Sequence, residues 1–178
     1  MRPTAALEDA LEGVAHVQEN TPEDVEVKRK VFPRLDAAAA PNAVLASSTS
    51  AILPSAFTET LNGRARCLVV HPINPPYLIP AAEVVPAPWT DVARIERTAS
   101  LLRSAGHAPI VMKREIDGFV MNRLQEALLE GAFRLVAEGY ASVEDIDIGL
   151  RDGLALRWSF IGPFEDPLTR ENGRSHAH

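Results

Sequence analysis

The chain has 178 residues, 46% of them hydrophobic and 24% charged, with a net charge of −6 and a pI near 5.4. This length suits one domain or one and a half, with enough apolar residues for a core. Because the chain is acidic and has no basic cluster, nucleic acid is not an expected partner. No apolar run is long enough to span a membrane, and the N-terminus is acidic where a signal peptide is apolar. We therefore expect no membrane partner and a cytoplasmic location.

The first part of the chain alternates helical and extended patterns. A helical pattern over 5–13 and a short strand over 14–18 come first. Thr21–Asp24 then provides the cap residue, proline and acids of a helix start, and an apolar face follows it. Further on, the sequence predicts strands over 43–47, 66–70, 82–85 and 109–112, and helices over 54–61 and 92–104. Such alternation is typical of an open parallel or mixed sheet.

The pattern changes to helix alone near residues 114–117. Gly118 to Gly139 predicts a single long helix, and Ser142–Asp145 caps another that runs to about Leu150. We expect residues 1–114 to be α/β and residues 115–178 to be helical, with a disordered tail from about 166. The tail holds two histidines, which are not expected to form a metal site.

The stretch HPINPPYLIPAAEVVPAP begins at His71 and has a titratable residue on each side of a proline-rich segment. Prolines cannot donate to a sheet ladder, so the stretch predicts two short strands joined by a rigid loop. His71 follows an apolar strand, at the end where open α/β sheets bind ligands. Glu83 on the next strand could accept the Nδ1–H of the imidazole and leave Nε2 free as a base. Spacing alone favours the plainer alternative, a buried histidine bonded to a carbonyl and a solvated glutamate.

Two further polar groups belong to the same predicted region. The hydroxyl cluster 47–50 ends a neighbouring strand, and Asn122 lies one turn into the long helix. Taken singly, the cluster is a cap with turn formers and Asn122 is an exposed helix position. Taken together with the histidine and the glutamate, they predict a cleft suited to removing a proton from an alcohol. Cys67, the only cysteine, is expected to be a small core residue rather than a nucleophile.

Five stretches occur in the order and spacing of the 3-hydroxyacyl-CoA dehydrogenase family: SSTSAILPS, VVHPINPPYLIPAAEVVP, DGFVMNRLQEALLEGAFRLVAEG, SVEDIDIGL and FIGPFE. The HPxNPP form, the NRLQ helix and RWSFIGPFE most resemble its lambda-crystallin branch, which includes L-gulonate 3-dehydrogenase. The resemblance covers roughly Leu7 to Glu165. It implies an incomplete Rossmann-type, doubly wound sheet followed by an all-helical segment. Residues 1–114 would then be the C-terminal portion of an NAD-binding domain, and 115–178 the N-terminal portion of the helical domain.

The resemblance also implies catalytic roles. His71 matches the catalytic base and Glu83 the acid that pairs with it, while Ser50 and Asn122 match polar residues around the substrate's reacting oxygen. In the family's mechanism His71 would take the hydroxyl proton of a 3-hydroxy acid or 3-hydroxyacyl-CoA while hydride passes to NAD. The imidazolium that forms would be stabilised by Glu83.

The cofactor and the oligomeric state are implied in the same way. NAD is the cofactor of the family. Asn74 matches a position near its nicotinamide, and Glu19 matches an acidic residue beside the nicotinamide ribose. The long helix of the second part is implied to pack in a homodimer.

The sequence departs from the family in two places. None of its ten glycines stands in a G-x-G relation to another, so the turn that seats the NAD pyrophosphate is missing. The residues after Glu165 resemble nothing expected of the helical domain. We therefore expect a fragment with impaired activity and an exposed apolar surface that promotes oligomerisation or aggregation. A non-catalytic structural or binding protein of lambda-crystallin type is the alternative, and a chain without a stable fold is a third possibility.

Overall fold

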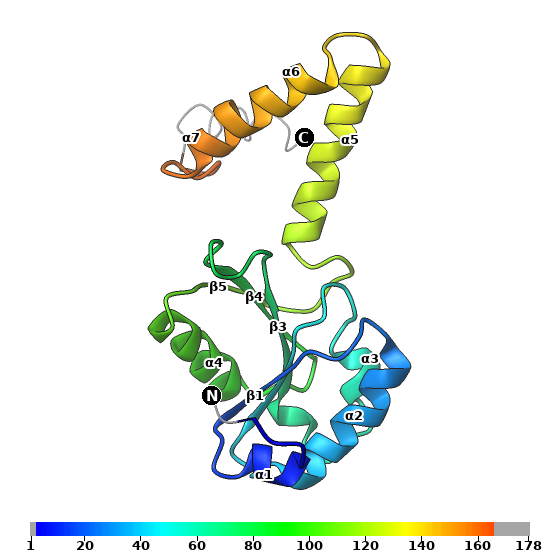
Figure 1. Ribbon diagram of the computed structural model, residues 1–178, viewed down its shortest axis with the longest axis vertical. Helices are drawn as coiled ribbons and strands as arrows, with labels where there is room; N and C mark the ends of the chain where they lie inside the picture. Colours follow the sequence, from blue (N-terminus) through cyan, green and yellow to red (C-terminus); the bar gives the residue numbers. More distant parts are fainter. Residues whose placement is uncertain (1–2, 166–178) are drawn as a thin grey trace, which may run out of the picture. The chain divides into compact units, whose positions relative to one another are not determined.

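The computed structural model describes residues 3–165, and the chain forms two compact units, Met1–Leu124 and Gln125–His178 (Figure 1). The first unit is a sheet with helices on both faces, and the described part of the second unit is helical. The division falls within a helix, C-terminal to the boundary at 114 expected from the sequence. The predicted disordered tail and its two histidines lie outside the described residues.

The sheet of the first unit has five strands in chain order and is mixed. The first three strands run parallel, the third and fourth are antiparallel, and the fourth and fifth are parallel. The strands are β1 (His16–Glu19), β2 (Val44–Ser47), β3 (Cys67–Pro72), β4 (Ala81–Pro86) and β5 (Ala108–Val111). All five strands were predicted, and β3 extends further than predicted, so that it includes His71.

Alternate residues of the central strands face two separate apolar cores. Leu45, Val69 and Val85 pack with residues of α1 (Leu7–Leu11), α2 (Val25–Ala38) and α3 (Ser55–Thr58), which cover one face. Their neighbours on the strands pack on the other face with Ile95 and Leu102 of α4 (Val92–Ser104). A short 3₁₀ turn, η1 (Arg64–Arg66), precedes β3. Burial of each such apolar side chain contributes about 1.5–3 kcal/mol to the stability of the fold. Because helices cover both faces, the sheet is doubly wound, as predicted.

Helix α2 begins later than the sequence suggested. Its N-cap is Asp24, whose carboxylate accepts hydrogen bonds from the backbone N–H groups of Glu26 and Val27 at 2.7 and 3.2 Å. Thr21, the predicted cap, instead donates its hydroxyl and its backbone N–H to Glu19. The prediction was wrong because two good cap residues stand three positions apart, and the first of them binds the carboxylate of Glu19 instead.

Helix α5 (Met121–Ala137) was predicted to begin at Gly118. Gly118 and Phe119 have φ values of +74° and +49°, in the left-handed region, so the helix begins only after them. Gly139, at φ +77°, follows the last turn, as a C-terminal glycine commonly does. The long single helix is confirmed, and its first turn is not helical because Gly118 and Phe119 turn the chain.

The second unit continues with helices only, as far as residue 165. Ser142 and Asp145 form a capping box at the start of α6 (Val143–Ile148), as the sequence predicted. A π-helical stretch, η2 (Gly149–Ala155), and α7 (Leu156–Trp158) follow directly.

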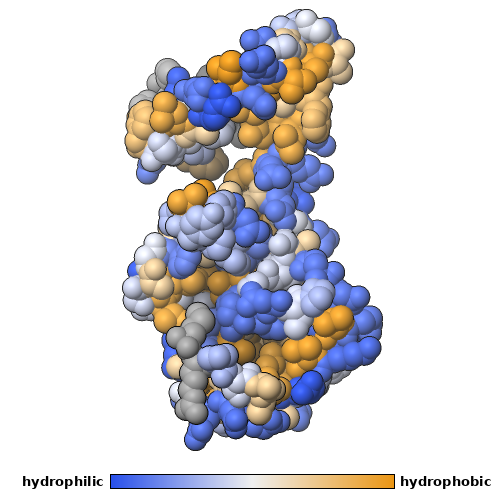
Figure 2. All heavy atoms as spheres, in the orientation of Figure 1, coloured by the Kyte–Doolittle hydropathy of each residue, from blue (hydrophilic) through white to orange (hydrophobic). Residues whose placement is uncertain are grey.

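The described residues of the second unit lie largely at the surface. None of residues 125–165 is buried, and apolar side chains such as Phe133 and Leu135 are 68% and 44% exposed. Apolar residues accordingly appear on the outside of these helices (Figure 2). This agrees with the exposed apolar surface that the sequence predicted. In the described part of the chain, no helix combines the length and apolarity that crossing a bilayer requires.

The cap of α2 can be tested against that of α4. Asp24→Ala should lower the free energy of unfolding by about 1 kcal/mol, because two backbone N–H groups lose their acceptor. Asp91, at the N-cap position of α4, makes no side-chain capping bond, so Asp91→Ala should cost only a few tenths of that amount. Urea denaturation measures both variants. Equal losses would contradict the cap assignment.

Candidate active site

The site is built on the antiparallel pair β3–β4. In the register of this pair His71 stands directly opposite Glu83, and residues directly opposite share one face of the sheet. The Nδ1 atom of His71 lies 2.8 Å from Oε2 of Glu83. The glutamate is fully buried and the histidine is 6% exposed. The predicted contact is therefore confirmed, and the solvated-glutamate alternative is wrong.

The second carboxylate oxygen of Glu83 is held by the start of α5. Oε1 accepts the backbone N–H groups of Val120 and Met121, at 2.8 and 2.9 Å. These donors point at the carboxylate because Gly118 and Phe119 turn the chain through two left-handed residues just before them. The positive end of the helix dipole thus faces a buried negative charge, which is a favourable arrangement.

The electrostatics of Glu83 follow from these contacts. Burial by itself raises the pKa of the carboxyl group. The hydrogen bonds from His71, Met121 and Val120, with the charge of His71, lower it by more, so the pKa of Glu83 lies below its ordinary value. Glu83 is therefore ionised near neutral pH despite its complete burial.

The ring of His71 is left with one functional nitrogen. Because Nδ1 faces a carboxylate, it carries the proton, and in the neutral ring Nε2 is then an acceptor. Among the described residues none hydrogen-bonds to Nε2. A histidine fixed in this tautomer by a buried carboxylate can accept a proton from a hydroxyl group.

Ser50 and Asn122 are brought into contact with each other. The side-chain amide of Asn122 donates from Nδ2 to the backbone carbonyl of Ser50 at 2.8 Å. Asn122 directly follows Met121 in the chain, and the backbone N–H of Met121 binds the buried carboxylate of Glu83. The Ser50 hydroxyl has no hydrogen-bond partner among the described residues. The contact joins the loop after β2 to the first turn of α5.

Glu23 is a member of this region that sequence reasoning missed. Its Oε1 accepts the hydroxyl of Thr49 at 2.5 Å and the backbone N–H groups of Ser50 and Ala51 at 3.1 Å each. The Ser50 peptide is thus held on both sides, its N–H by Glu23 and its carbonyl by Asn122. Glu23 was assigned to the first turn of a helix. Because α2 in fact begins at Val25, Glu23 precedes the helix, and its carboxylate binds the loop after β2.

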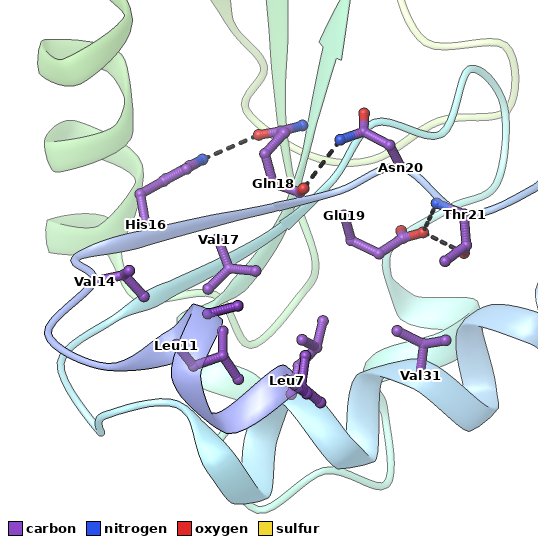
Figure 3. Close-up of a pocket in the computed structure, with 12 residues that line it drawn as sticks. Leu7, Leu11, Val14, His16, Val17, Gln18, Glu19, Asn20, Thr21 and Val31 are labelled. Carbon is purple, nitrogen blue, oxygen red and sulfur yellow. Dashed lines mark hydrogen bonds between the residues drawn. The ribbon is translucent and has the colours of Figure 1, made fainter. Parts of the chain in front are cut away.

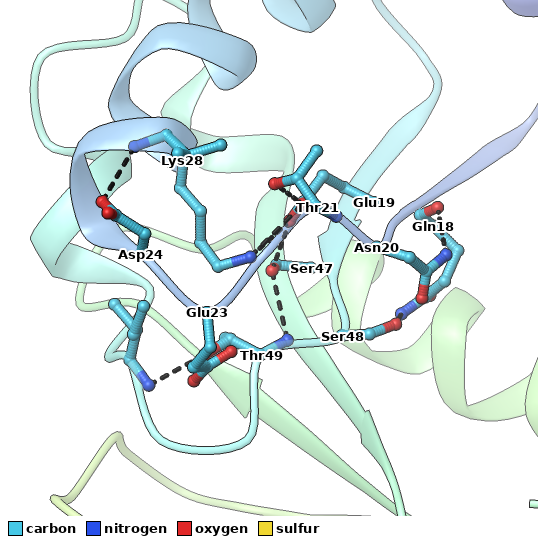
Figure 4. A network of polar contacts seen from close by, with 12 residues as sticks. Gln18, Glu19, Asn20, Thr21, Glu23, Asp24, Lys28, Ser47, Ser48 and Thr49 are labelled. Carbon is cyan, nitrogen blue, oxygen red and sulfur yellow. Dashed lines mark hydrogen bonds and ion pairs between the residues drawn. The ribbon is translucent and has the colours of Figure 1, made fainter.

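Glu19, the predicted ribose ligand, lies in a buried polar network (Figure 4). Its Oε2 accepts the hydroxyl of Ser47 at 2.6 Å and lies 3.0 Å from Nζ of Lys28, which is fully buried. Its Oε1 accepts from Thr21 and Lys28. Burial raises the pKa of Glu19. The hydrogen bonds from Ser47, Thr21 and Lys28 lower it by more, so the pKa lies below its ordinary value. Both carboxylate oxygens are therefore engaged inside the fold.

The other predicted positions differ in exposure. Asn74 is exposed in the β3–β4 loop, just before a cis peptide bond to Pro75. Cys67 is fully buried, and burial raises the pKa of its thiol to about 12. A thiol of this kind is inert near neutral pH, which confirms its prediction as a core residue.

A cavity of about 310 Å³ lies under β1, between α1 and α2 (Figure 3). Val17 and the helix residues Leu7 and Leu11 point into it, whereas His16 and Gln18 point to the other side of the strand. Neither His71 nor Glu83 lines this cavity. Its lining is largely apolar, and the carboxylate of Glu19 on it is already bound by Lys28, Ser47 and Thr21. The candidate site is therefore the β3–β4 pair.

Comparisons with known proteins identify the two halves of the chain. Residues 1–116 match the family profile for the NAD binding domain of 3-hydroxyacyl-CoA dehydrogenase, and residues 118–166 match the profile for its C-terminal domain. The chain belongs to the 3-hydroxyacyl-CoA dehydrogenase family. The resemblance expected from the motifs is thereby confirmed.

Individual relatives support the same conclusion. Lambda-crystallin of Oryctolagus cuniculus is 48% identical over 159 residues, which are 89% of this chain and 50% of the relative. L-carnitine dehydrogenase of Streptomyces coelicolor is 43% identical over 160 residues, 90% of this chain and 50% of the relative. The chain thus spans about half the length of these relatives.

Solved structures show the same fold. FHMPC 5-dehydrogenase, an NAD+ dependent dismutase, matches with a TM-score of 0.84 and 33% identity over 91% of this chain and 52% of its own. The 3-hydroxyacyl-CoA dehydrogenase of Archaeoglobus fulgidus matches with a TM-score of 0.78 and 30% identity, over 88% of this chain and 54% of its own.

The lowered pKa values of Glu83 and Glu19 predict how stability depends on pH. A carboxyl group whose pKa is lower in the folded state contributes stability above its ordinary value, 4.5 here, and loses it as the pH falls through the folded pKa. The free energy of unfolding should therefore decline below about pH 4.5.

Glu83→Gln tests the lowered pKa of Glu83, because it removes that carboxylate and leaves the carboxylate of Glu19. At neutral pH the variant should be less stable by about 3 kcal/mol or more, since an amide has only one acceptor oxygen and cannot accept both from His71 and from the backbone N–H groups at the start of α5. The wild-type and variant curves should converge as the pH falls. Urea denaturation across the pH range measures this, and parallel curves would contradict the assignment.

Proposed function

We propose that this chain carries the proton-abstracting half of an NAD-dependent dehydrogenase that oxidises a 3-hydroxy acid or 3-hydroxyacyl-CoA to the 3-oxo product. The observation that carries the proposal is the buried His71–Glu83 pair, with Nε2 of the ring free of partners among the described residues. Membership of the family and its NAD-binding domain support the reaction class.

In this mechanism His71 accepts the proton of the substrate hydroxyl at Nε2. The imidazolium that results lies 2.8 Å from an ionised carboxylate, which stabilises it relative to an imidazolium without a partner. Glu83 keeps its position because two backbone N–H groups hold its other oxygen. The Ser50 hydroxyl and the Asn122 amide supply hydrogen bonds to the reacting oxygen of the substrate.

NAD would supply the acceptor for the hydride that leaves the substrate carbon. The chain fits the nicotinamide end of the cofactor, because Asn74 is exposed in the loop that directly follows His71 and its amide can both donate and accept. Glu19 would support this end indirectly, since its own oxygens bind Lys28, Ser47 and Thr21. With no G-x-G turn in the sequence, we propose that NAD binds weakly to this chain alone and that turnover is low.

The substrate class is proposed at two levels. Relatives named L-carnitine dehydrogenase indicate a small hydroxy acid, and the family profile indicates an acyl-CoA thioester. The alternative function, a structural protein, draws its support from the relatives named lambda-crystallin. A polar pair fixed at the substrate end of the sheet favours catalysis, because a structural role makes no use of a free Nε2.

Replacement of the base gives the direct test of function. His71→Ala should reduce the rate of NAD-dependent oxidation about a hundredfold or more, the usual loss for a general base. Glu83→Gln should cost less, because the amide can still orient the ring. NADH absorbance measures both with L-carnitine, L-gulonate and 3-hydroxybutyryl-CoA as substrates. His107→Ala is the matched control, because the His107 ring bonds to the Pro80 carbonyl and contacts no member of the candidate site among the described residues.

An active wild-type protein in which His71→Ala and His107→Ala behave alike would contradict the assignment of the base. A well-folded wild-type protein without turnover on any of these substrates would favour the structural alternative.

We also propose a homodimer formed through the helical unit, in the cytoplasm. Leu128, Phe133 and Leu135 expose apolar surface on α5, and such a surface on a soluble helix is normally covered by another element. Light scattering at micromolar concentration should give twice the monomer mass or more, and Leu128→Glu should lower it. A clean wild-type monomer would contradict the proposal.

A further inference from the structure

Phe119 has a conformation that its residue type disfavours. Its side chain is fully buried, yet its φ is +49°, and it follows Gly118 at +74°. Glycine adopts such angles freely, whereas a bulky residue there is an outlier that persists only where its surroundings fix it. A glycine would serve the turn at position 119 with less strain. The contacts of the aromatic side chain must therefore stabilise the structure by more than the backbone strain costs.

The ring of Phe119 packs against the ring of His71. The two centroids are 5.7 Å apart and the ring planes are inclined by 55°, a tilted arrangement within the range of favourable aromatic pairs. Phe119 also belongs to the core cluster on that face of the sheet, together with Val69, Val85 and Met112. One side of the ring system is thus anchored in the core while another part contacts the imidazole.

The same turn also acts on Glu83. The two residues after Phe119 donate their backbone N–H groups to Oε1, while Oε2 faces Nδ1 of His71. A single left-handed turn thereby fixes the carboxylate through hydrogen bonds and the imidazole through ring packing.

We propose that Phe119 is a positioning residue for His71: its ring, held in the left-handed turn, restricts rotation of the imidazole so that Nε2 stays directed at the substrate site. The proposal rests on the proposed role of His71 as the base. In this account Phe119 acts through His71 and touches no reacting atom. Loss of the ring should widen the rotation of the imidazole and weaken the Nδ1–H bond to Glu83 while the fold is retained.

Phe119→Leu tests this, with Phe57→Leu as the matched control. Phe57 is a buried ring in the same core cluster, 4.6 Å from the Phe32 ring, and it has no ring contact with His71. The readout is the exchange rate with water of the His71 Nδ1 proton, followed by NMR in the intact chain. Phe119→Leu should speed this exchange by about threefold to tenfold, as loss of an aromatic pair implies, beyond any change in the control.

Equal acceleration in the two variants would overturn the proposal, because it would show only a general loss of core stability. If Phe119→Leu does not fold, ring-to-ring proton contacts between Phe119 and His71 in the wild-type protein decide instead, and their absence overturns it. In a wild type with measurable turnover, kcat should fall in Phe119→Leu with KM unchanged. The exchange comparison needs no turnover, so failure of the proposed function and failure of this inference are separate results.

Discussion

The buried carboxylate of Glu83 is the interaction on which the site depends. It joins three elements at once: its own strand β4, the neighbouring strand β3 through His71, and the start of α5 through two backbone N–H groups. An ionised carboxylate left without partners in the interior would cost several kcal/mol. The chain can bury this charge only if the strand register, the left-handed turn and the helix start are all correct. The geometry of the site and the local fold therefore depend on the same contacts of Glu83.

The molecule uses a second buried carboxylate in a different way. Glu19 is paired with a buried lysine and accepts the hydroxyl groups of Ser47 and Thr21, so its negative charge is balanced by a positive charge beside it. Glu83 instead faces a histidine, a partner that can itself gain or lose a proton. This difference separates a structural carboxylate from one that can support proton transfer, although the pKa of each is lowered by its surroundings.

Most of the fold could be predicted from the sequence, because apolar periodicity and helix caps are local signals. The five strands, α4 and the capping box at Ser142 follow directly from them. The start of α2 could not be placed, because Thr21 is drawn away from the cap by Glu19, a carboxylate that Ser47 and Lys28 also bind. The start of α5 could not be placed, because it depends on the contact of the left-handed turn with Glu83, which is distant in sequence. Local propensity does not report such contacts.

The candidate site was predictable in part. The two members of the His71–Glu83 pair could be named from their motifs, and the antiparallel register explains why they meet. Glu23 and Phe119 could not be found, because a loop-binding carboxylate and a strained aromatic residue look ordinary in one sequence. Glu19 shows the opposite case, in which a match to a motif gave no information about the buried lysine beside it.

The central claim is that Glu83 fixes the tautomer of His71 and leaves Nε2 as the proton acceptor. The ¹⁵N chemical shifts of the two ring nitrogens, measured on the neutral ring in the intact chain, test it most directly. The claim predicts a protonated Nδ1 and an unprotonated Nε2 in the wild type, with mixed tautomers in Glu83→Ala. A neutral wild-type ring that carries its proton on Nε2 would contradict it.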